Sequence, residues 1–218
     1  FIAPTSAPTR IREGLGIEEQ IERLVGSAVL EDEDSPYAKA LNWIMFDDPQ
    51  QLTVDDENFV QRYIASYFSY ATSTVAPWLS CSPAAGDETK VCYYQRLTST
   101  NPIKYEPFRW IRWLSEDHEC KWAGVVCDDS LQIRAIEVGK YFVAAVEVLV
   151  YLQLKISFIS HNSFETSAEA QEIKGKFPEG VVHFPFLQSL SLPFNQISGS
   201  LPSTMGNLRH LVSLEVHS

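Results

Sequence analysis

Four cysteines are the residues best placed to do chemistry in this chain: Cys81, Cys92, Cys120 and Cys127. They fall into two local pairs, an arrangement that suits two short disulfides and an oxidising compartment. The alternative is a zinc site that includes the nearby His118. Because the chain has no C-x2-C spacing, zinc ligation is the less favoured interpretation.

Catalytic motifs are not found in the sequence. There is no G-x-S-x-G, P-loop, H-E-x-x-H or G-x-G-x-x-G. The acidic pairs Asp47-Asp48 and Asp55-Asp56 could serve as paired carboxylates, but they fall at the expected ends of helices, where acids complement the helix dipole. We therefore predict that the chain is not an enzyme and that it uses no cofactor and no metal.

The negative charge of the chain argues against some classes of binding partner. The formal net charge is −11, and residues 1–60 carry thirteen acidic side chains against four basic ones. This excess of acid argues against nucleic acid, whose binding requires Lys and Arg to displace counterions, and against an anionic membrane surface. The most apolar run, residues 141–154, contains Glu147 and is shorter than the roughly 20 residues of a bilayer span. No membrane span is predicted within the chain, although an anchor can lie outside it.

The chain begins at Phe1 and ends inside a repeat, so we interpret it as a fragment. Its first 35 residues are predicted to be an acidic flexible tether, without structure up to Gly16. One short amphipathic helix is expected where apolar residues recur at helical spacing, namely Ile17, Ile21, Leu24 and Val25.

A helical and disulfide-bonded cap region is expected over residues 36–132. Ser35-Pro36 supplies the capping hydroxyl and the first-turn proline of one helix, which Pro49 ends. Thr53 and Asp56 resemble a capping box at the start of the next helix. Residues 72–109 are expected to form a loop in which Cys81 and Cys92 close an insert. The second helix carries an aromatic and aliphatic stripe that predicts core rather than a ligand surface: Phe59, Val60, Tyr63, Ile64, Tyr67, Phe68 and Tyr70.

Internal repetition is the strongest pattern in the sequence. Residues 187–202 read L-x-x-L-x-L-x-x-N-x-I-x-G-x-L-P, and the next unit begins 24 residues later, a period typical of leucine-rich repeats. The alternating leucines predict a short strand, and Asn195 is expected to bond backbone groups of its turn and of the neighbouring unit. One unit cannot bury its own leucines, so units must stack. The predicted repeat core comprises Leu187, Leu190, Leu192, Asn195, Ile197, Leu201, Leu211 and Leu214.

Residues 113–127, W-L-S-E-D-H-E-C-K-W-A-G-V-V-C, resemble the N-terminal cap of plant-type leucine-rich-repeat proteins, whose signature is W-L followed by C-x-W-x-G-V-x-C. The repeat also resembles the plant-type unit, and together the motifs cover residues 110–218. The resemblance implies a disulfide between Cys120 and Cys127 and a buried cap in which Trp122, near Trp113, packs over the first repeat. The segments Ala40-Leu-Asn-Trp43 and Asp48-Pro49 are similar to repeat proteins of diatom-type microalgae, which are secreted or membrane-tethered.

The first repeat is interrupted. Ile136 and Val138 match the positions of Leu190 and Leu192, but the distance to the next matching position is 30 residues too long, and removing residues 140–169 restores the register. Two explanations stay open. The segment is a retained intron, since Gly139-Lys140-Tyr141 and Ala168-Glu169 have codons that can contain splice sites in matching phase, or it is a genuine insertion extruded from the repeats.

The expected fold is mixed α/β: a helical N-terminal cap region that leads into a leucine-rich-repeat solenoid with short parallel strands, residues 133–218, truncated at the C-terminus. The resemblance implies a receptor-like protein, extracellular or membrane-anchored, that binds a protein or peptide ligand through outward strand positions. The alternatives are a structural or cell-wall-associated protein without a specific ligand and a protein inhibitor of an extracellular enzyme. The candidate binding face comprises Arg134, Glu137, Gln188, Ser191, Val212, Ser213, Glu215 and His217.

Overall fold

The computed structural model describes residues 7–75, 78, 81, 91–98, 104–138, 173–192 and 195–216, and within these ranges the side chains of 7–15, 91–98 and 104–110 are not described. Helices come first in the chain and short strands follow. The expected insertion, residues 140–169, and the candidate residue His217 lie outside the described residues. None of the helices in these ranges combines the length and the apolar character that crossing a membrane would require.

The first helix, α1, spans Ala7–Val25, so the prediction of no structure up to Gly16 is wrong. A proline in the first turn, Pro8, is compatible with a helix start because the amide that it lacks would have no partner there. The expected apolar face is nevertheless correct, since Ile17 and Ile21 are buried. A 3-10 turn, η1 (Ser27–Val29), follows before the exposed acidic run of residues 31–34.

The second helix, α2 (Pro36–Asn42), begins as predicted. The Ser35 hydroxyl accepts a hydrogen bond from the Ala38 amide at 3.0 Å and donates one to the Val29 carbonyl at 2.7 Å. The helix widens into a π-turn, η2 (Trp43–Asp47), which ends just before Pro49. The Trp43 and Ile44 side chains of this turn are buried.

The third helix, α3 (Phe59–Thr72), starts later than the sequence suggested. Asp56 accepts hydrogen bonds from the Thr53 amide at 2.6 Å and hydroxyl at 2.9 Å, so the expected capping box closes an isolated turn and Asn58 becomes the residue before the helix. The predicted stripe is core: Tyr63, Ile64 and Phe68 are fully buried. Polar residues of α3 are buried as well, which the sequence did not indicate.

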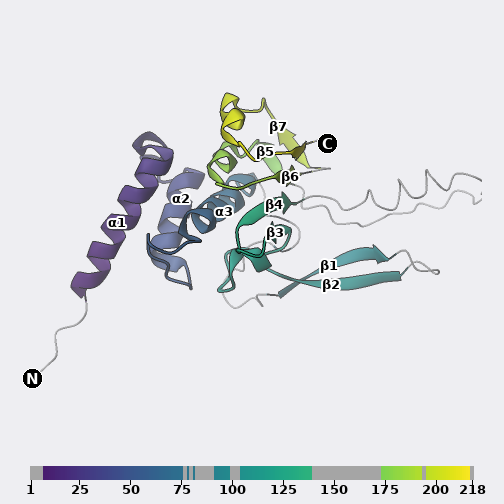
Figure 1. The fold of residues 1–218 in the computed structure, drawn as a ribbon, viewed down its shortest axis with the longest axis horizontal. Helices are drawn as coiled ribbons and strands as arrows, with labels where there is room; N and C mark the ends of the chain where they lie inside the picture. The colour runs from purple at the N-terminus through teal and green to yellow at the C-terminus, as the bar shows by residue number, and fades with distance from the viewer. Residues whose placement is uncertain are drawn as a thin grey trace, which may run out of the picture.

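The loop predicted over residues 72–109 is wrong in part, because residues 91–98 and 104–109 belong to an antiparallel hairpin. Strand β1 (Val91–Thr98) pairs with β2 (Lys104–Ile111), and the register runs from Val91 opposite Ile111 to Thr98 opposite Lys104. Both segments are rich in β-branched and aromatic residues, which favour extended backbone. The hairpin extends away from the rest of the protein (Figure 1).

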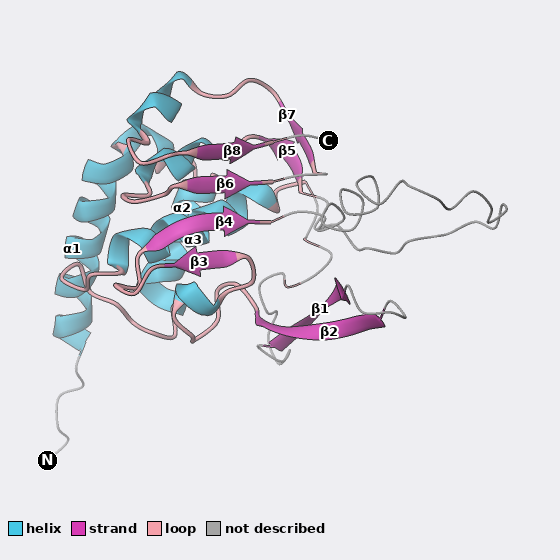
Figure 2. Ribbon diagram, turned by 45° about the vertical axis from the view of Figure 1, so that its right-hand side comes forward, coloured by secondary structure: helices cyan, strands magenta, loops and turns pink. Residues whose placement is uncertain are grey.

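A four-stranded sheet follows, in the order β3-β4-β6-β8. Strand β3 (Val125–Cys127) is antiparallel to β4 (Ile133–Glu137), while β4, β6 (Ser189–Ser191) and β8 (Ser213–Glu215) are parallel. Figure 2 shows these strands side by side with the helices gathered at one side. Ile136, Leu190 and Leu214 are register partners, which confirms the equivalence expected between the interrupted first repeat and those that follow.

The return paths of the repeats are 3-10 turns. Turns η4 (Glu179–His183) and η5 (Ser203–Asn207) have the 24-residue spacing of the sequence repeat. Between strand and turn, β5 (Lys174–Lys176) pairs in parallel with β7 (Gln196–Ser198). Here the register differs from the sequence repeat, because Gly175 rather than Ile173 lies opposite Ile197. The Asn195 side chain bonds directly to Ile173 and places these two residues level with each other.

One core joins the helices and the repeats. Leu187, Leu190 and Leu192 are at most 1% exposed, as predicted, and they belong to the same cluster as the buried residues of α1 and α3. The Tyr67 hydroxyl of α3 accepts a hydrogen bond from the Gly180 amide of η4 at 3.1 Å. Two predicted positions are less buried: Ile197 is partly exposed, and Leu201 is 50% exposed, so its assignment to the core is wrong. The last repeat is covered on one face only, and Leu211 and Leu214 are accordingly half-buried.

Candidate functional site

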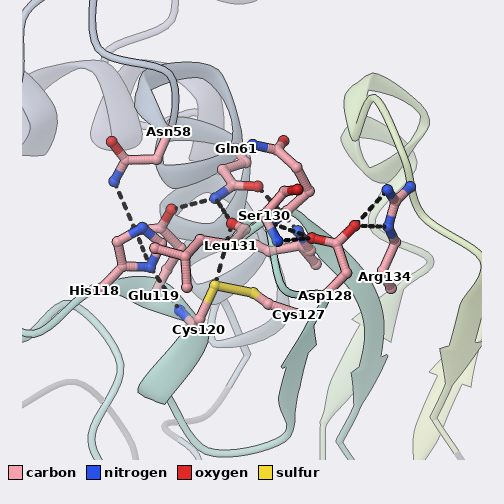
Figure 3. The surroundings of a disulfide bond; sticks show 12 residues. Asn58, Gln61, His118, Glu119, Cys120, Cys127, Asp128, Ser130, Leu131 and Arg134 are labelled. Carbon is pink, nitrogen blue, oxygen red and sulfur yellow. Dashed lines mark hydrogen bonds and ion pairs between the residues drawn. A yellow bond between two sulfur atoms is a disulfide. The ribbon is translucent and has the colours of Figure 1, made fainter.

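The predicted cap disulfide is present. Cys120 and Cys127 are joined, with a Cα–Cα distance of 5.5 Å, and the bond ties the turn η3 (Glu119–Lys121) to β3 (Figure 3). A zinc site at these two thiols is therefore wrong, because neither sulfur is free. Cys81 is also disulfide-bonded, and the side chain of Cys92 lies outside the described part of the chain.

The two cap tryptophans are fully buried, and their rings pack in a tilted arrangement at a ring-centroid distance of 5.5 Å. The indole N–H of Trp113 donates to the Ala123 carbonyl at 2.7 Å, and that of Trp122 donates to the Ser115 hydroxyl at 3.1 Å. Each large apolar ring thus has its one polar atom satisfied, which is what allows complete burial. The two tryptophans belong to the same buried core as Val125 of strand β3.

Arg62 is fully buried, and its guanidinium bonds to several segments of the cap. Its Nε and Nη2 donate to the two carboxylate oxygens of Asp48 at 2.8 and 2.7 Å, and Nη1 donates to Glu119 at 3.3 Å. The remaining N–H groups reach the Ser115 and Asp117 carbonyls at 2.8 and 3.0 Å. All five donors of the guanidinium are used, so its burial leaves none unpaired.

Two aromatic rings enclose the same guanidinium. The Cζ atom of Arg62 lies 5.2 Å from the centre of the Trp43 ring and 4.9 Å from that of Trp122. Cation–π attraction is strongest where water is excluded, as it is here. The sequence prediction for Asp48, an acid that merely complements a helix dipole, is wrong: the residue is 3% exposed and binds Arg62.

Glu119 and Gln61 extend this network to the sheet. The Gln61 amide nitrogen donates to Glu119 at 2.7 Å and to the Leu131 carbonyl at 2.8 Å, while its oxygen accepts from the Ile133 amide at 3.0 Å (Figure 3). Asn58 adds a 3.3 Å contact to Glu119. Helix α3 is therefore bonded through side chains to the disulfide turn and to the first residue of β4.

The groups of this buried network bond to one another and join helix α3 to the cap. Beside it, His118 Nδ1 accepts a hydrogen bond from the Cys120 amide at 3.2 Å. No cluster of three or more His, Cys, Asp or Glu side chains suited to hold a metal ion occurs among the described residues. One sequence signal could have pointed to the network, because Arg62 is the one charged residue within Phe59–Thr72.

The structure brings the described residues of the candidate binding face together on the sheet. Glu137, Ser191 and Glu215 are register partners and form one outward row, in which the Ser191 hydroxyl donates to Glu215 at 2.8 Å. Ala135, Ser189 and Ser213 form the second row, in which Ala135 is buried and the two serines are partly exposed. The inward positions between the rows hold the buried apolar residues, as period-two alternation requires.

A third row lies at the N-terminal ends of the same strands. The Gln188 amide donates to the Arg134 carbonyl, and the Val212 amide donates to the Gln188 carbonyl, each at 2.7 Å. Val212 is 88% exposed, which is unusual for a β-branched apolar side chain. These three residues stand two positions before Ile136, Leu190 and Leu214, at the end of the sheet. Together with the two outward rows they are called the recognition face below.

Asp128, Phe186 and His210 lie beside this face and were not predicted from the sequence as part of it. Arg134 is bound by Asp128 at 2.7 Å and lies with its Cζ 4.9 Å from the centre of the Phe186 ring. The Phe186 and His210 rings are 5.9 Å apart. These two rings are separated by one repeat, so the 24-residue period could have identified them.

The carboxylate of Asp128 is stabilised in its charged form. The hydrogen bond from the Gln132 amide is the largest cause that lowers the pKa of Asp128, and the bond from Arg134 is the next largest.

Comparison with known proteins finds no match for this chain among protein-family models, curated proteins or solved structures.

Proposed function

We propose that this chain is the capped N-terminal part of a leucine-rich-repeat protein and that its recognition face binds a protein or peptide. The observation that supports the proposal is the register of β4, β6 and β8. Ile136 and Leu190 are buried and Leu214 is half-buried in one row of this sheet. The alternate rows hold mostly polar side chains that are partly exposed, or fully so at Glu215. A face made of repeated strands offers a broad surface of the kind that suits an extended polypeptide.

The chemistry of the recognition face also favours a polypeptide ligand. Exposed Val212 and the partly exposed Phe186 ring offer apolar contact area, while Gln188, Ser191 and Glu215 offer hydrogen-bonding groups. Interfaces of proteins combine aromatic anchors with a polar rim in this way.

An extracytoplasmic location is part of the proposal. It is supported by the Cys120–Cys127 bond, since disulfides persist in oxidising compartments and are rare in the cytosol. The bond lies beside the buried Arg62 network, where it fixes the turn that supplies Glu119.

A selection from a displayed library of random peptides tests this function. Peptides enriched on the oxidised full chain are expected to bind the V212E variant at least tenfold more weakly. The substitution replaces an exposed apolar side chain with a carboxylate, which removes the apolar contact with the peptide. The matched control is T204E, which places the same charge on the exposed surface of η5 in the same repeat. Absence of any enriched peptide, or equal loss of binding in both variants, contradicts the proposed function.

A further inference from the structure

The side chain of Asn195 binds the backbone on both sides of the interruption in the first repeat. The Asn195 amide nitrogen donates to the Val138 carbonyl at 2.8 Å, and the Asn195 carbonyl oxygen accepts from the Ile173 amide at 3.0 Å. Asn195 is 2% exposed, so water does not replace these bonds. The two backbone groups bound to a single amide lie within about 8 Å of each other.

The chain on both sides of the interruption already has the geometry of the repeat. Before it, Ile136 lies opposite Leu190, and the Val138 amide donates to the Ser191 carbonyl at 2.9 Å. After it, Ile173 is 1% exposed and its carbonyl accepts from the Gln196 amide at 2.7 Å. The repeat therefore stops and resumes at adjacent places in the fold.

The number of residues needed to close this gap is known from the next repeat. Four residues separate Leu192 from Ile197, and four would separate Val138 from Ile173 if residues 140–169 were absent. Five Cα–Cα steps reach roughly 17 Å when extended, about twice the separation that Asn195 spans. The shortened connection thus fits without stretching the backbone.

We propose that residues 140–169 are an addition to an already complete repeat, and that a chain in which Gly139 is joined directly to Ala170 folds to the same sheet. Asn195 closes the first repeat in both forms. The inference does not depend on the proposed binding function, and it holds for either origin of the segment, a retained intron or a genuine insertion.

The test compares the oxidised full chain with a variant that lacks residues 140–169. Thermal unfolding followed by circular dichroism is expected to be cooperative in both, with the midpoint of the shortened chain equal to or above that of the full chain. Amide hydrogen exchange is expected to protect Val138, Gln188, Leu192 and Val212 in both, since their amides donate within the sheet. Loss of cooperative unfolding, or loss of protection at Leu192, in the shortened chain overturns the proposal.

Asn195→Ala provides the second arm. Removing the amide leaves the Val138 carbonyl and the Ile173 amide unpaired in a buried place, so the unfolding midpoint is expected to fall by at least roughly 5 °C in both forms. The matched control is Asn207→Ala, at an exposed asparagine of η5, which is expected to leave the midpoint unchanged. A loss confined to the full chain would mean that Asn195 does not close the shortened repeat, and it would overturn the proposal as well.

Discussion

Arg62 and Asp48 form a two-point ion pair with N–O distances of 2.8 and 2.7 Å, and neither side chain is accessible to solvent. The parallel geometry is the one in which a guanidinium and a carboxylate bind most strongly. The pair joins α3 to the turn that follows α2, and Glu119 connects it to the disulfide. The stability of the cap should therefore depend on this arginine.

Replacing Arg62 with methionine is expected to lower the free energy of unfolding by about 3–5 kcal/mol, because two buried carboxylates lose their cationic partner. Urea denaturation of the oxidised chain measures this change. Arg209→Met, at an exposed arginine, is the control and should shift the value by less than about 0.5 kcal/mol. A loss below about 1 kcal/mol for R62M would contradict the buried network.

Removal of the cap disulfide by the double substitution C120A/C127A is expected to lower the free energy of unfolding by about 2–3 kcal/mol, as the closed loop is short. Cys81 and Cys92 stay unchanged, so the loss reports on one bond. Thermal and urea unfolding of the double variant measure it, and unchanged stability would show that the bond does not constrain the unfolded chain.

Gly180 packs so closely on Tyr67 that an added Cβ would collide with the aromatic ring. Gly180→Ala is therefore expected to destabilise the protein by about 1–3 kcal/mol. Gly206→Ala is a suitable control, because nothing lies within 4 Å of the new methyl group and Gly206 belongs to the corresponding turn of the next repeat. Equal effects of the two substitutions would contradict the contact between α3 and η4.

The partly buried His183 is expected to make the stability of the protein depend on pH. Burial lowers the pKa of its imidazole below the ordinary value of 6.5, so the unfolded chain takes up a proton before the folded one does. Stability contributed by neutral His183 is present above pH 6.5 and is lost as the pH falls through the lowered folded-state pKa. The unfolding midpoint, measured between pH 7.5 and about 5, is expected to decline less in His183→Gln than in the wild-type chain. His210→Gln is the control at an exposed histidine, and identical profiles for all three proteins would contradict the prediction.

Short-range patterns predicted much of this architecture. Ser35-Pro36 begins a helix, Leu190 and Leu192 alternate into the core, and Asn195 bonds the backbone of the neighbouring unit. Each of these outcomes is decided by residues close in sequence or by the 24-residue period. The candidate binding residues were likewise predictable from the period, because the register repeats them at the same place on successive strands.

Contacts between distant segments were not predictable in this way. Arg62 binds Asp48 across 14 residues and Glu119 across 57, and no local pattern relates these positions. The Thr53–Asp56 pair has the spacing of a helix start, yet it closes a separate turn because the helix begins where Phe59 enters the core. Leu201 carries the sequence signature of a core residue, yet its side chain is 50% exposed, because burial is decided by the contacts between units and not by the local pattern.

A crystal structure of the oxidised full chain would show the rows of the sheet, on which both the fold and the recognition face depend. The side chains of Ile136, Leu190 and Leu214 are expected to share one inward row. Ser191 and Glu215 are expected to face outward beside each other, and Cys120 to be joined to Cys127. Electron density that places Leu190 and Leu192 in solvent, or that leaves Cys120 and Cys127 apart, would contradict these expectations.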